Sequence, residues 1–356
     1  MEPVRIAVIP GDGVGKEVVP EAVRVLDAVS SSGGALEFVY TDLDWGCDLY
    51  RATGRMMPED GLDRLAHSDA ILLGAIGAPD IPDHLSLWGL LIPIRRHFQQ
   101  YINLRPIRLL PGVVSPLRDR EAGSIDMMVV RENSEGEYSV IGGRIHEGTP
   151  SEVALQVDYF SRIGTERVMR YAFDLARGRS RRLTVCTKSN GIVHTMPFWD
   201  QVAREISTEY PDVEVEFALV DALAARFITH PDTLDVVVGS NLHADILTDI
   251  GGAIMGSIGL APAANLNPER ALPSMFEPVH GSAPDIAGKQ IANPIGEIWT
   301  AAMMLDFLGS RADARRVVDA IEVTLRSGVG TPDIGGSDST SYVTDAIIDN
   351  LPEATD

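Results

Sequence analysis

The stretch IAVIPGDGVGKE, residues 6–17, decides whether this chain can carry a Rossmann domain. It joins an apolar run to a glycine-rich turn and a helical pattern, as the Rossmann motif does. That motif requires the spacing G-x-G-x-x-G, whereas Gly11, Gly13 and Gly15 are spaced G-x-G-x-G and Lys16 stands in the sixth place. The third glycine is out of register, which favours a plain strand-to-helix turn over a phosphate-binding loop.

The composition of the whole chain argues against several classes of protein. Its 356 residues are enough for two domains, and the formal net charge of −21 leaves no basic patch for a nucleic-acid partner. The two cysteines, Cys47 and Cys186, form no CxxC pair, which suits a reducing compartment. We find neither a signal peptide nor an apolar stretch long enough to cross a membrane, and therefore expect a cytoplasmic protein.

Short apolar runs alternate with amphipathic stretches, and this pattern predicts an α/β architecture. Strands are predicted at residues 4–9, 70–73, 125–130, 183–186 and 234–238. Helices are predicted at residues 14–30, 85–99, 158–176, 194–210 and 244–256. Pro93 falls inside the second of these helices and should kink or restart it.

Two aspartates in the segment NLHADILTD, residues 241–249, indicate a metal site. Asp245 and Asp249 are four residues apart in a helical pattern, so their Cβ atoms should lie roughly 6 Å apart on one face. Mg²⁺ or Mn²⁺ would relieve the repulsion between two such carboxylates. A solvated helix face is the alternative, but the pair directly follows a buried strand, where ligand sites of α/β proteins gather.

Three arginines, one tyrosine and one lysine suggest which kind of small molecule the protein binds. Arg95, Arg105 and Arg131 each adjoin an apolar segment, where a lone cation is costly and an anionic partner is expected. Together with the metal they would suit a small acid with two carboxylates. Lys188 ends a predicted strand, where a partly desolvated amine can act as a base, and Tyr138 is a second candidate. Taken singly, each of these residues could equally be an ordinary surface group.

Long motifs make the chain resemble a known family, the metal-dependent, NAD(P)-linked β-decarboxylating 2-hydroxyacid dehydrogenases. This family includes isopropylmalate, isocitrate, homoisocitrate and tartrate/D-malate dehydrogenases. The resemblance runs from IPGDGVGKEV to GGSDSTSYVTDAI and is strongest in NLHADILTDIGGAIMGSIGLAPAANL and FEPVHGSAPDIAGKQIANP. It implies an isopropylmalate/isocitrate dehydrogenase-like fold, not a Rossmann fold. It also implies two α/β domains with the active site in the cleft between them.

The resemblance assigns the cofactor and the domains. It implies a larger cofactor-side domain of residues 1–100 and 256–356, and a smaller domain of residues 101–255 for substrate, metal and dimerisation. The cofactor residues it implies are Gly74, Ala75, His280, Gly281, Ser282, Ala283, Asp285 and Asn293. Asp285 would accept hydrogen bonds from the ribose hydroxyls and repel a 2′-phosphate, so NAD is favoured over NADP.

The resemblance also implies a role for each candidate catalytic residue. Arg95, Arg105 and Arg131 would hold the substrate carboxylates, and Tyr138 would protonate the enol carbon after CO₂ leaves. The metal ligands would be Asp221, Asp245 and Asp249. Lys188 would remove the hydroxyl proton, and Lys188 and Asp221 would both come from a second copy, which makes the enzyme a homodimer. Activation by K⁺ occurs in the family, and the sequence leaves it open here.

The segment WGLLIPIRR, residues 88–96, bears on the substrate. Trp88 and Leu91 would line the substrate pocket, and Trp88 resembles the tryptophan of tartrate/D-malate dehydrogenases. Leu90 and Pro93 depart from that pattern and would make the wall more apolar, so 3-isopropylmalate or another 3-alkylmalate remains an alternative. A non-catalytic regulatory chain should lack Tyr138, Lys188 or a metal aspartate, and all of these are present.

Overall fold

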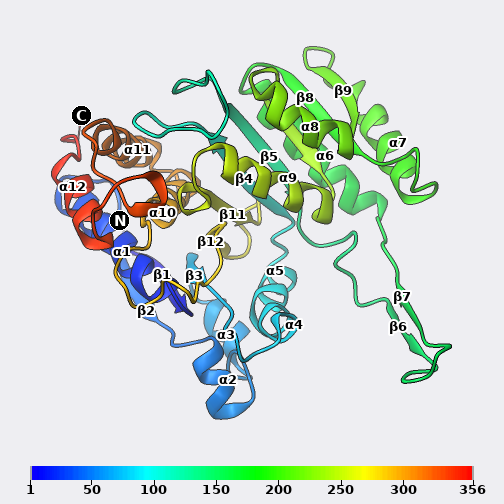
Figure 1. The fold of residues 1–356 in the computed structure, drawn as a ribbon, viewed down its shortest axis with the longest axis horizontal. Helices are drawn as coiled ribbons and strands as arrows, with labels where there is room; N and C mark the ends of the chain where they lie inside the picture. The colour runs from blue at the N-terminus through cyan, green and yellow to red at the C-terminus, as the bar shows by residue number, and fades with distance from the viewer. Residues whose placement is uncertain (1, 355–356) are drawn as a thin grey trace. The chain divides into compact units, whose positions relative to one another are not determined.

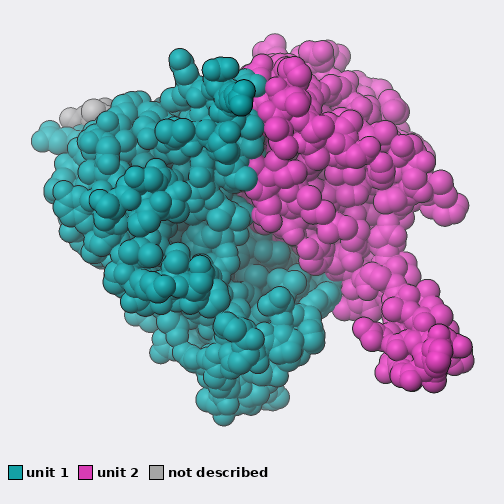
Figure 2. Space-filling view, viewed as in Figure 1, with its two compact units in different colours: residues 1–100, 106–125, 252–356 teal, residues 101–105, 126–251 magenta. Residues whose placement is uncertain are grey.

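The computed structural model describes residues 2–354, which divide into two compact units. Unit 1 comprises residues 1–100, 106–125 and 252–356, and unit 2 comprises residues 101–105 and 126–251 (Figure 2). Strand β4 (Ile102–Arg108) begins in unit 2 and ends in unit 1. None of the helices within residues 2–354 combines the length and the apolarity that a bilayer crossing needs.

Unit 1 is a sheet covered by helices (Figure 1). Its strands are β1 (Val4–Gly11), β2 (Phe38–Asp42), β3 (Ala70–Ala75), β11 (Pro262–Leu266) and β12 (Ser274–Pro278). Its helices are α1 (Gly15–Ser31), α2 (Cys47–Thr53), α3 (Gly61–Leu65), α4 (Asp83–Ser86), α5 (Ile92–His97), α10 (Ile295–Phe307), α11 (Arg311–Arg326) and α12 (Thr340–Asp349). Short 3₁₀ helices add Ile258–Leu260 and Pro332–Ile334.

The sheet of unit 1 is mixed, which separates it from a Rossmann sheet. Its strand order is β2-β1-β3-β12-β11, and β11 pairs antiparallel to β12 while the other pairs are parallel. A Rossmann sheet instead has the order 3-2-1-4-5-6. The predicted α/β class and the predicted exclusion of the Rossmann fold are both confirmed.

The glycine turn after β1 is a packing element. The backbone N–H groups of Asp12, Val14 and Gly15 donate to carbonyl oxygens of the protein, at 2.7, 2.9 and 3.0 Å. A Cβ on Gly13 would lie 1.9 Å from the Ser282 carbonyl oxygen, so only glycine fits there. These N–H groups already have partners and cannot cradle a phosphate, in agreement with the interpretation as a plain turn.

Unit 2 has a parallel sheet of order β5-β10-β8-β9. Its strands are β5 (Asp126–Glu132), β6 (Gly142–Ile145), β7 (Val153–Gln156), β8 (Arg182–Thr187), β9 (Glu214–Leu219) and β10 (Val236–Gly239). Its helices are α6 (Arg162–Arg177), α7 (Thr195–Ser207), α8 (Val220–Thr229) and α9 (Asn241–Ile254), with a 3₁₀ turn at Pro231–Thr233; the last residues of α9 belong to unit 1. Trp199 is fully buried and packs edge-on against Phe160, with ring centroids 5.5 Å apart.

Strands β6 and β7 form an antiparallel arm that extends from the rest of unit 2 (Figure 1). Every residue of both strands is exposed, and the arm carries Ile145, Val153 and Leu155 with 51%, 43% and 58% of their surface open. An isolated two-stranded hairpin is marginally stable in water.

The unit boundaries differ in part from the predicted domains. Residues 106–125 and 252–255 were expected in the smaller domain and lie in unit 1. Contacts within unit 1 hold them there: the Ser115 hydroxyl donates to the Ile254 carbonyl oxygen at 2.7 Å, and Gly112 packs against the backbone of Leu325. The chain changes unit inside β4, between Arg105 and Pro106, where both residues are buried and no turn marks the boundary.

Two predicted helices begin or divide differently in the structure. The expected helix 85–99 is helical without a break from Asp83 to His97, as α4, a π-helical turn at Leu87–Leu91, and α5 with Pro93 in its first turn. Pro93 therefore does not restart the helix, and the irregularity is the π-helical turn directly before it. The expected helix 158–176 begins only at Arg162. Ser161 caps it, because its side chain accepts a hydrogen bond from the Gly164 N–H at 2.9 Å.

Candidate active site

One carboxylate of unit 2, Asp245 on α9, binds several of the predicted site residues. The Arg131 guanidinium donates to Asp245 Oδ1, and the Tyr138 hydroxyl donates to Asp245 Oδ2 at 3.0 Å. The Arg105 Nη1 atom lies 3.3 Å from the same Oδ1 atom. Sequence positions more than 100 residues apart thus form one cluster of two cations, one phenol and one carboxylate.

The two arginines of this cluster are buried and held by neutral side chains. Arg131 donates from Nε and Nη2 to the Asn241 amide oxygen, at 3.0 and 2.7 Å. Arg105 donates from Nε to the Asn103 amide oxygen at 2.7 Å and from Nη1 to the Thr248 hydroxyl at 2.6 Å. These neutral acceptors fix the direction of each guanidinium, and both guanidinium groups also contact Asp245. One carboxylate does not balance two guanidinium charges, so the pair keeps the capacity to bind an anion.

Glu137, which the sequence analysis missed, ties the start of α9 to the loop that carries Tyr138. Its carboxylate accepts from the Ser240 hydroxyl at 2.8 Å and from the Leu242 N–H at 3.1 Å. A carboxylate is favourable at a helix N-terminus, where backbone N–H groups are unpaired. This contact positions the Tyr138 side chain against Asp245.

A second missed residue, Glu132, shapes the same loop from inside. It is fully buried at the end of β5, and it accepts from the backbone N–H groups of Ser134 and Glu135 at 2.9 and 2.8 Å. Burial raises the pKa of Glu132 even though these hydrogen bonds oppose the shift. Its only signal in the sequence is the motif RENSEGEYS, which marks the region without giving a reason for this glutamate.

Asp249 lies one helical turn beyond Asp245, as predicted, and its carboxylate is chemically suited to a cation. Burial and then the nearby Asp245 carboxylate raise the pKa of Asp249, which reports two acidic groups close together. Within residues 2–354, no three His, Cys, Asp or Glu side chains gather as a metal site. The pair of oxygen donors therefore fits a hard divalent cation that takes its further ligands from elsewhere.

Lys188 and Asp221 contact each other within one chain. The Lys188 ammonium lies 2.6 Å from Asp221 Oδ1, and 31% and 65% of the two side chains are exposed. Hydrogen bonding to Lys188 lowers the pKa of Asp221. Lys188 directly follows β8, and Asp221 lies in the first turn of α8, directly after β9. Because β8 and β9 pair in parallel, their ends bring the two side chains together.

In unit 1, Arg95 is buried in an ion pair that the sequence analysis did not foresee. Its Nη2 atom lies 2.5 Å from Glu277 Oε1, and the Asn265 amide donates to the same oxygen at 2.8 Å. The Arg95 Nε atom has no hydrogen-bond partner among the described residues. A buried donor without a partner is costly, and it leaves one edge of this guanidinium available to a ligand.

The segment before Arg95 contains two buried leucines and one half-buried tryptophan. Leu90 and Leu91 are both buried in the core cluster of unit 1, which also contains Met56 and Ile94. Trp88 is half-buried, and the Arg96 guanidinium carbon lies 4.9 Å from the centroid of its ring. Of the four side chains that were expected to affect the pocket wall, Leu90 and Leu91 are buried, whereas Trp88 and Pro93 are both half-buried.

A pocket in unit 1 gathers three of the predicted cofactor residues. His280, Ala283 and Asn293 line a hollow of about 130 Å³ together with apolar side chains, among them Ile258 and Ile286. The His280 Nε2 atom is buried without a partner among the described residues, and burial lowers the pKa of this imidazole. Small apolar walls and a neutral imidazole with one open nitrogen fit the adenosine part of a nucleotide.

The remaining predicted cofactor residues fall into two groups, one near the surface and one buried in a strand. Gly281, Ser282 and Asp285 continue the His280 segment along the surface, and a Cβ on Gly281 would meet open space. Gly74 and Ala75 instead lie buried in β3. A Cβ on Gly74 would come within 2.5 Å of the Pro10 carbonyl oxygen, so this glycine serves the packing of β3 against the first turn.

The chain as a whole is similar to several known proteins. The isocitrate/isopropylmalate dehydrogenase family pattern matches residues 5–349. A probable tartrate dehydrogenase/decarboxylase of Agrobacterium vitis is 53% identical over 98% of this chain and 97% of its own length. The decarboxylating D-malate dehydrogenase of Escherichia coli K12 is 52% identical over 98% of each chain.

The fold of this chain is also similar to that of a solved structure. The crystal structure of isocitrate dehydrogenase from Methylococcus capsulatus superimposes with a TM-score of 0.87 at 32% identity, over 98% of this chain and 99% of that chain. Both the predicted family and the predicted fold are thereby confirmed. The chain belongs to the isocitrate/isopropylmalate dehydrogenase family.

Proposed function

We propose that this chain is an NAD- and divalent-metal-dependent dehydrogenase of a small 2-hydroxy diacid, such as (R)-malate or tartrate. Oxidation is followed by decarboxylation where it produces a β-keto acid. The observation that carries the proposal is the cluster at Asp245, in which one carboxylate joins Arg105, Arg131 and Tyr138. The names of the relatives, tartrate dehydrogenase/decarboxylase and D-malate dehydrogenase, support the same substrate class.

The residues of the chain divide the work of this reaction. Arg105 and Arg131 bind the substrate carboxylates, with a contribution from Arg95. Lys188 accepts the proton of the C2 hydroxyl group in its neutral amine form, and the Tyr138 hydroxyl protonates the enol carbon after CO₂ has left. When bound, the divalent cation supplies Lewis-acid polarisation of the C2 oxygen, and NAD accepts the hydride.

The proposed ligand assignments follow from the donor sets. Asp245 and Asp249 would hold Mg²⁺ or Mn²⁺ through carboxylate oxygens, with Asp221 of a second copy as a further ligand. NAD would lie along His280–Asp285 and Asn293, where His280 offers an open ring nitrogen. The exposed Asp285 carboxylate disfavours a 2′-phosphate, which supports NAD over NADP. K⁺ is proposed only as an activating ion.

A homodimer with shared active sites completes the proposal. Asp221 pairs with Lys188 in its own chain, and no ion pair within residues 2–354 joins either residue to Asp245. Both are partly exposed and available to a second copy. The exposed apolar arm of β6 and β7 supplies a surface for such pairing.

The substrate is tested by NADH formation with purified protein and Mn²⁺ or Mg²⁺. (R)-malate, both chiral tartrates and meso-tartrate are compared with 3-isopropylmalate and isocitrate, using NAD and NADP in parallel. The highest kcat/KM is expected for (R)-malate or a tartrate with NAD. Preference for 3-isopropylmalate would favour the alternative. Of the two residues that suggest it, Leu90 is buried in the core and Pro93 is half-buried.

Thr248→Val is expected to weaken substrate binding more than turnover. The Thr248 hydroxyl accepts from Arg105 and donates to the α9 backbone, and valine keeps the shape but removes this hydrogen-bond acceptor from the buried guanidinium. A loss of about 1–3 kcal/mol corresponds to a KM raised roughly 5- to 150-fold. Steady-state kinetics check this, with the exposed Thr229→Val as control. An unchanged KM would mean that Thr248 does not position Arg105.

Leu155→Lys is expected to split the proposed dimer. Lysine on the exposed arm would bury a charge at a subunit interface, where an unpaired cation is costly. Size-exclusion chromatography with light scattering should then report the mass of one chain, and NADH formation should fall because Lys188 and Asp221 no longer reach a second copy. A variant that remains dimeric and active would exclude the arm from the interface.

A further inference from the structure

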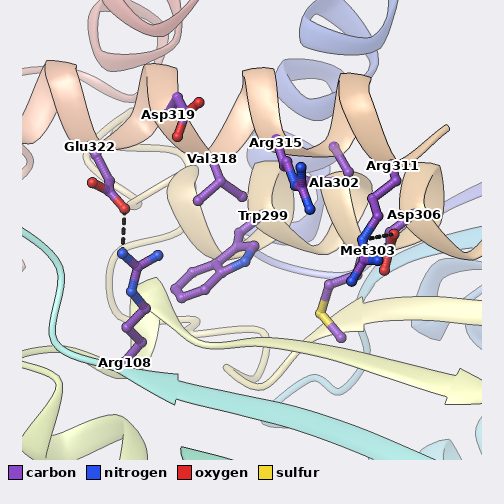
Figure 3. Close-up of a pocket in the computed structure, with 11 residues that line it drawn as sticks. Arg108, Trp299, Ala302, Met303, Asp306, Arg311, Arg315, Val318, Asp319 and Glu322 are labelled. Carbon is purple, nitrogen blue, oxygen red and sulfur yellow. Dashed lines mark ion pairs between the residues drawn. The ribbon is translucent and has the colours of Figure 1, made fainter. Parts of the chain in front are cut away.

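A groove between α10 and α11 in unit 1 has no part in the proposed reaction. It has a volume of about 350 Å³, at the lower end of the range of small-ligand sites. Its apolar lining is formed by Trp299, Ala302, Met303, Ala314 and Val318. The rest of the lining is charged: Arg108, Asp306, Arg311, Arg315, Asp319 and Glu322. Figure 3 shows the Trp299 indole between the two helices, with Val318 directed toward it from α11.

Two ion pairs occupy the ends of the groove. At one end Arg108 lies 2.6 Å from Glu322, and at the other Arg311 lies 3.7 Å from Asp306 (Figure 3). The first pair is partly buried, whereas the second is loose, with 75% and 56% of its side chains exposed. Neither end therefore offers a strong unpaired charge to a ligand.

Arg315 in the middle of the groove differs from the arginines at the ends. It lines the groove from α11, and among residues 2–354 it makes neither an ion pair nor a side-chain hydrogen bond. Arg316, its neighbour on the same helix, is buried and paired with Asp313 at 2.9 Å. Arg315 is thus a free guanidinium beside an aromatic and aliphatic floor, in a chain whose net charge is −21.

Three carboxylates line the groove, and Asp319 is the one that has no ion pair among residues 2–354, because Asp306 and Glu322 are paired with Arg311 and Arg108. It follows Arg315 by one helical turn, and in Figure 3 Val318 lies between it and the indole of Trp299. A ligand seated on Trp299 would therefore meet Arg315 before it meets Asp319. The groove suits a molecule with an apolar or flat body and a single negative group.

We propose that this groove binds a small monocarboxylate with an apolar body, seated on Trp299, Met303 and Val318 with its carboxylate on Arg315. The guanidinium would bind the carboxylate through paired N–H donors, and the indole and thioether would cover the apolar part. The site lies wholly within unit 1 and does not depend on the proposed reaction.

The test is isothermal titration calorimetry of the full-length protein with phenylacetate, and with the uncharged phenylacetamide as its matched ligand. Phenylacetate is expected to bind with a dissociation constant in the roughly millimolar range or below, and phenylacetamide at least tenfold more weakly. Arg315→Met, which keeps the apolar stem, should weaken phenylacetate binding at least tenfold. Arg118→Met, at an exposed arginine outside the groove, should leave it unchanged.

Three results would overturn the proposal. The first is no binding of phenylacetate at about 10 mM. The second is binding that Arg315→Met leaves unchanged, which would assign the carboxylate to another set of arginines. The third is tighter binding of L-phenylalanine than of phenylacetate, which would make the site one for a zwitterion that uses Asp319. Val318→Glu provides a second groove variant and should abolish binding by adding a carboxylate to the wall.

Discussion

Asp245→Asn is expected to lower kcat/KM for the preferred hydroxy diacid by roughly three orders of magnitude. Asp245 accepts a hydrogen bond from the Tyr138 hydroxyl and contacts two buried arginines. It is also one of the two proposed metal ligands on α9. Asparagine keeps the shape, but it removes the charge and turns an N–H₂ group toward a cation. The substitution therefore removes the carboxylate that Tyr138, the two arginines and the proposed metal all contact.

The expected loss is separable into its causes. NADH formation measured against Mn²⁺ concentration gives the activation constant of the metal, and calorimetry with Mn²⁺ alone gives its binding. Asp245→Glu keeps the charge and should retain Mn²⁺ binding while turnover falls. Asp212→Asn, at an exposed ion pair with Arg177, is the matched control and should be neutral. Turnover of Asp245→Asn within tenfold of the parent would contradict the central place of this carboxylate.

The sequence predicted those features of the fold that rest on local patterns. The turn after β1 was recognisable because the glycine spacing is read directly from residues 11–15. The acid pair on α9 was recognisable because a separation of four residues fixes one helix face. The arm of β6 and β7 was not predicted, since both faces of its strands are exposed and no alternation of apolar and polar residues marks them.

Contacts between distant residues account for what the sequence could not predict. Arg95 was proposed as a substrate ligand, but nothing near it in the sequence indicates Glu277, which lies 182 positions away and binds it. Glu137 likewise reaches α9 across more than 100 positions. Leu90 differs from the expected family pattern, and only the three-dimensional structure shows that the difference falls in the core. Long-range pairing is set by the fold and leaves no periodic signal.

Glu297 illustrates a further gap, since neither a motif nor the proposed reaction accounts for it. It lies in the first turn of α10 with none of its surface exposed, and neither carboxyl oxygen has a hydrogen-bond partner among the described residues. Burial, and then the nearby Glu277 carboxylate, raise the pKa of Glu297 well above its ordinary value. The folded protein therefore holds Glu297 neutral at a pH where the unfolded chain ionises it.

Glu297→Gln is expected to stabilise the protein, and the gain should grow with pH. Above the pKa of an unfolded glutamate, about 4.3, the unfolded state has lost a proton that the folded state keeps. The free energy of unfolding of the parent then falls with rising pH, by up to about 1.4 kcal/mol per pH unit, until Glu297 ionises in the folded state. Glutamine does not titrate and removes this penalty.

Urea unfolding at pH 5 and pH 8 measures the effect. The midpoints of parent and Glu297→Gln should lie close together at pH 5, and at pH 8 the variant should unfold at clearly higher urea. Glu121→Gln, at an exposed glutamate of unit 1, is the control for the change of side chain and should shift neither midpoint. If parent and Glu297→Gln showed the same pH dependence, Glu297 would have to be ionised in the folded state and stabilised by a partner. A carboxyl group that is buried without a hydrogen-bond partner lowers the free energy of unfolding. Glu297 is therefore a residue that the parent protein keeps at a cost in stability.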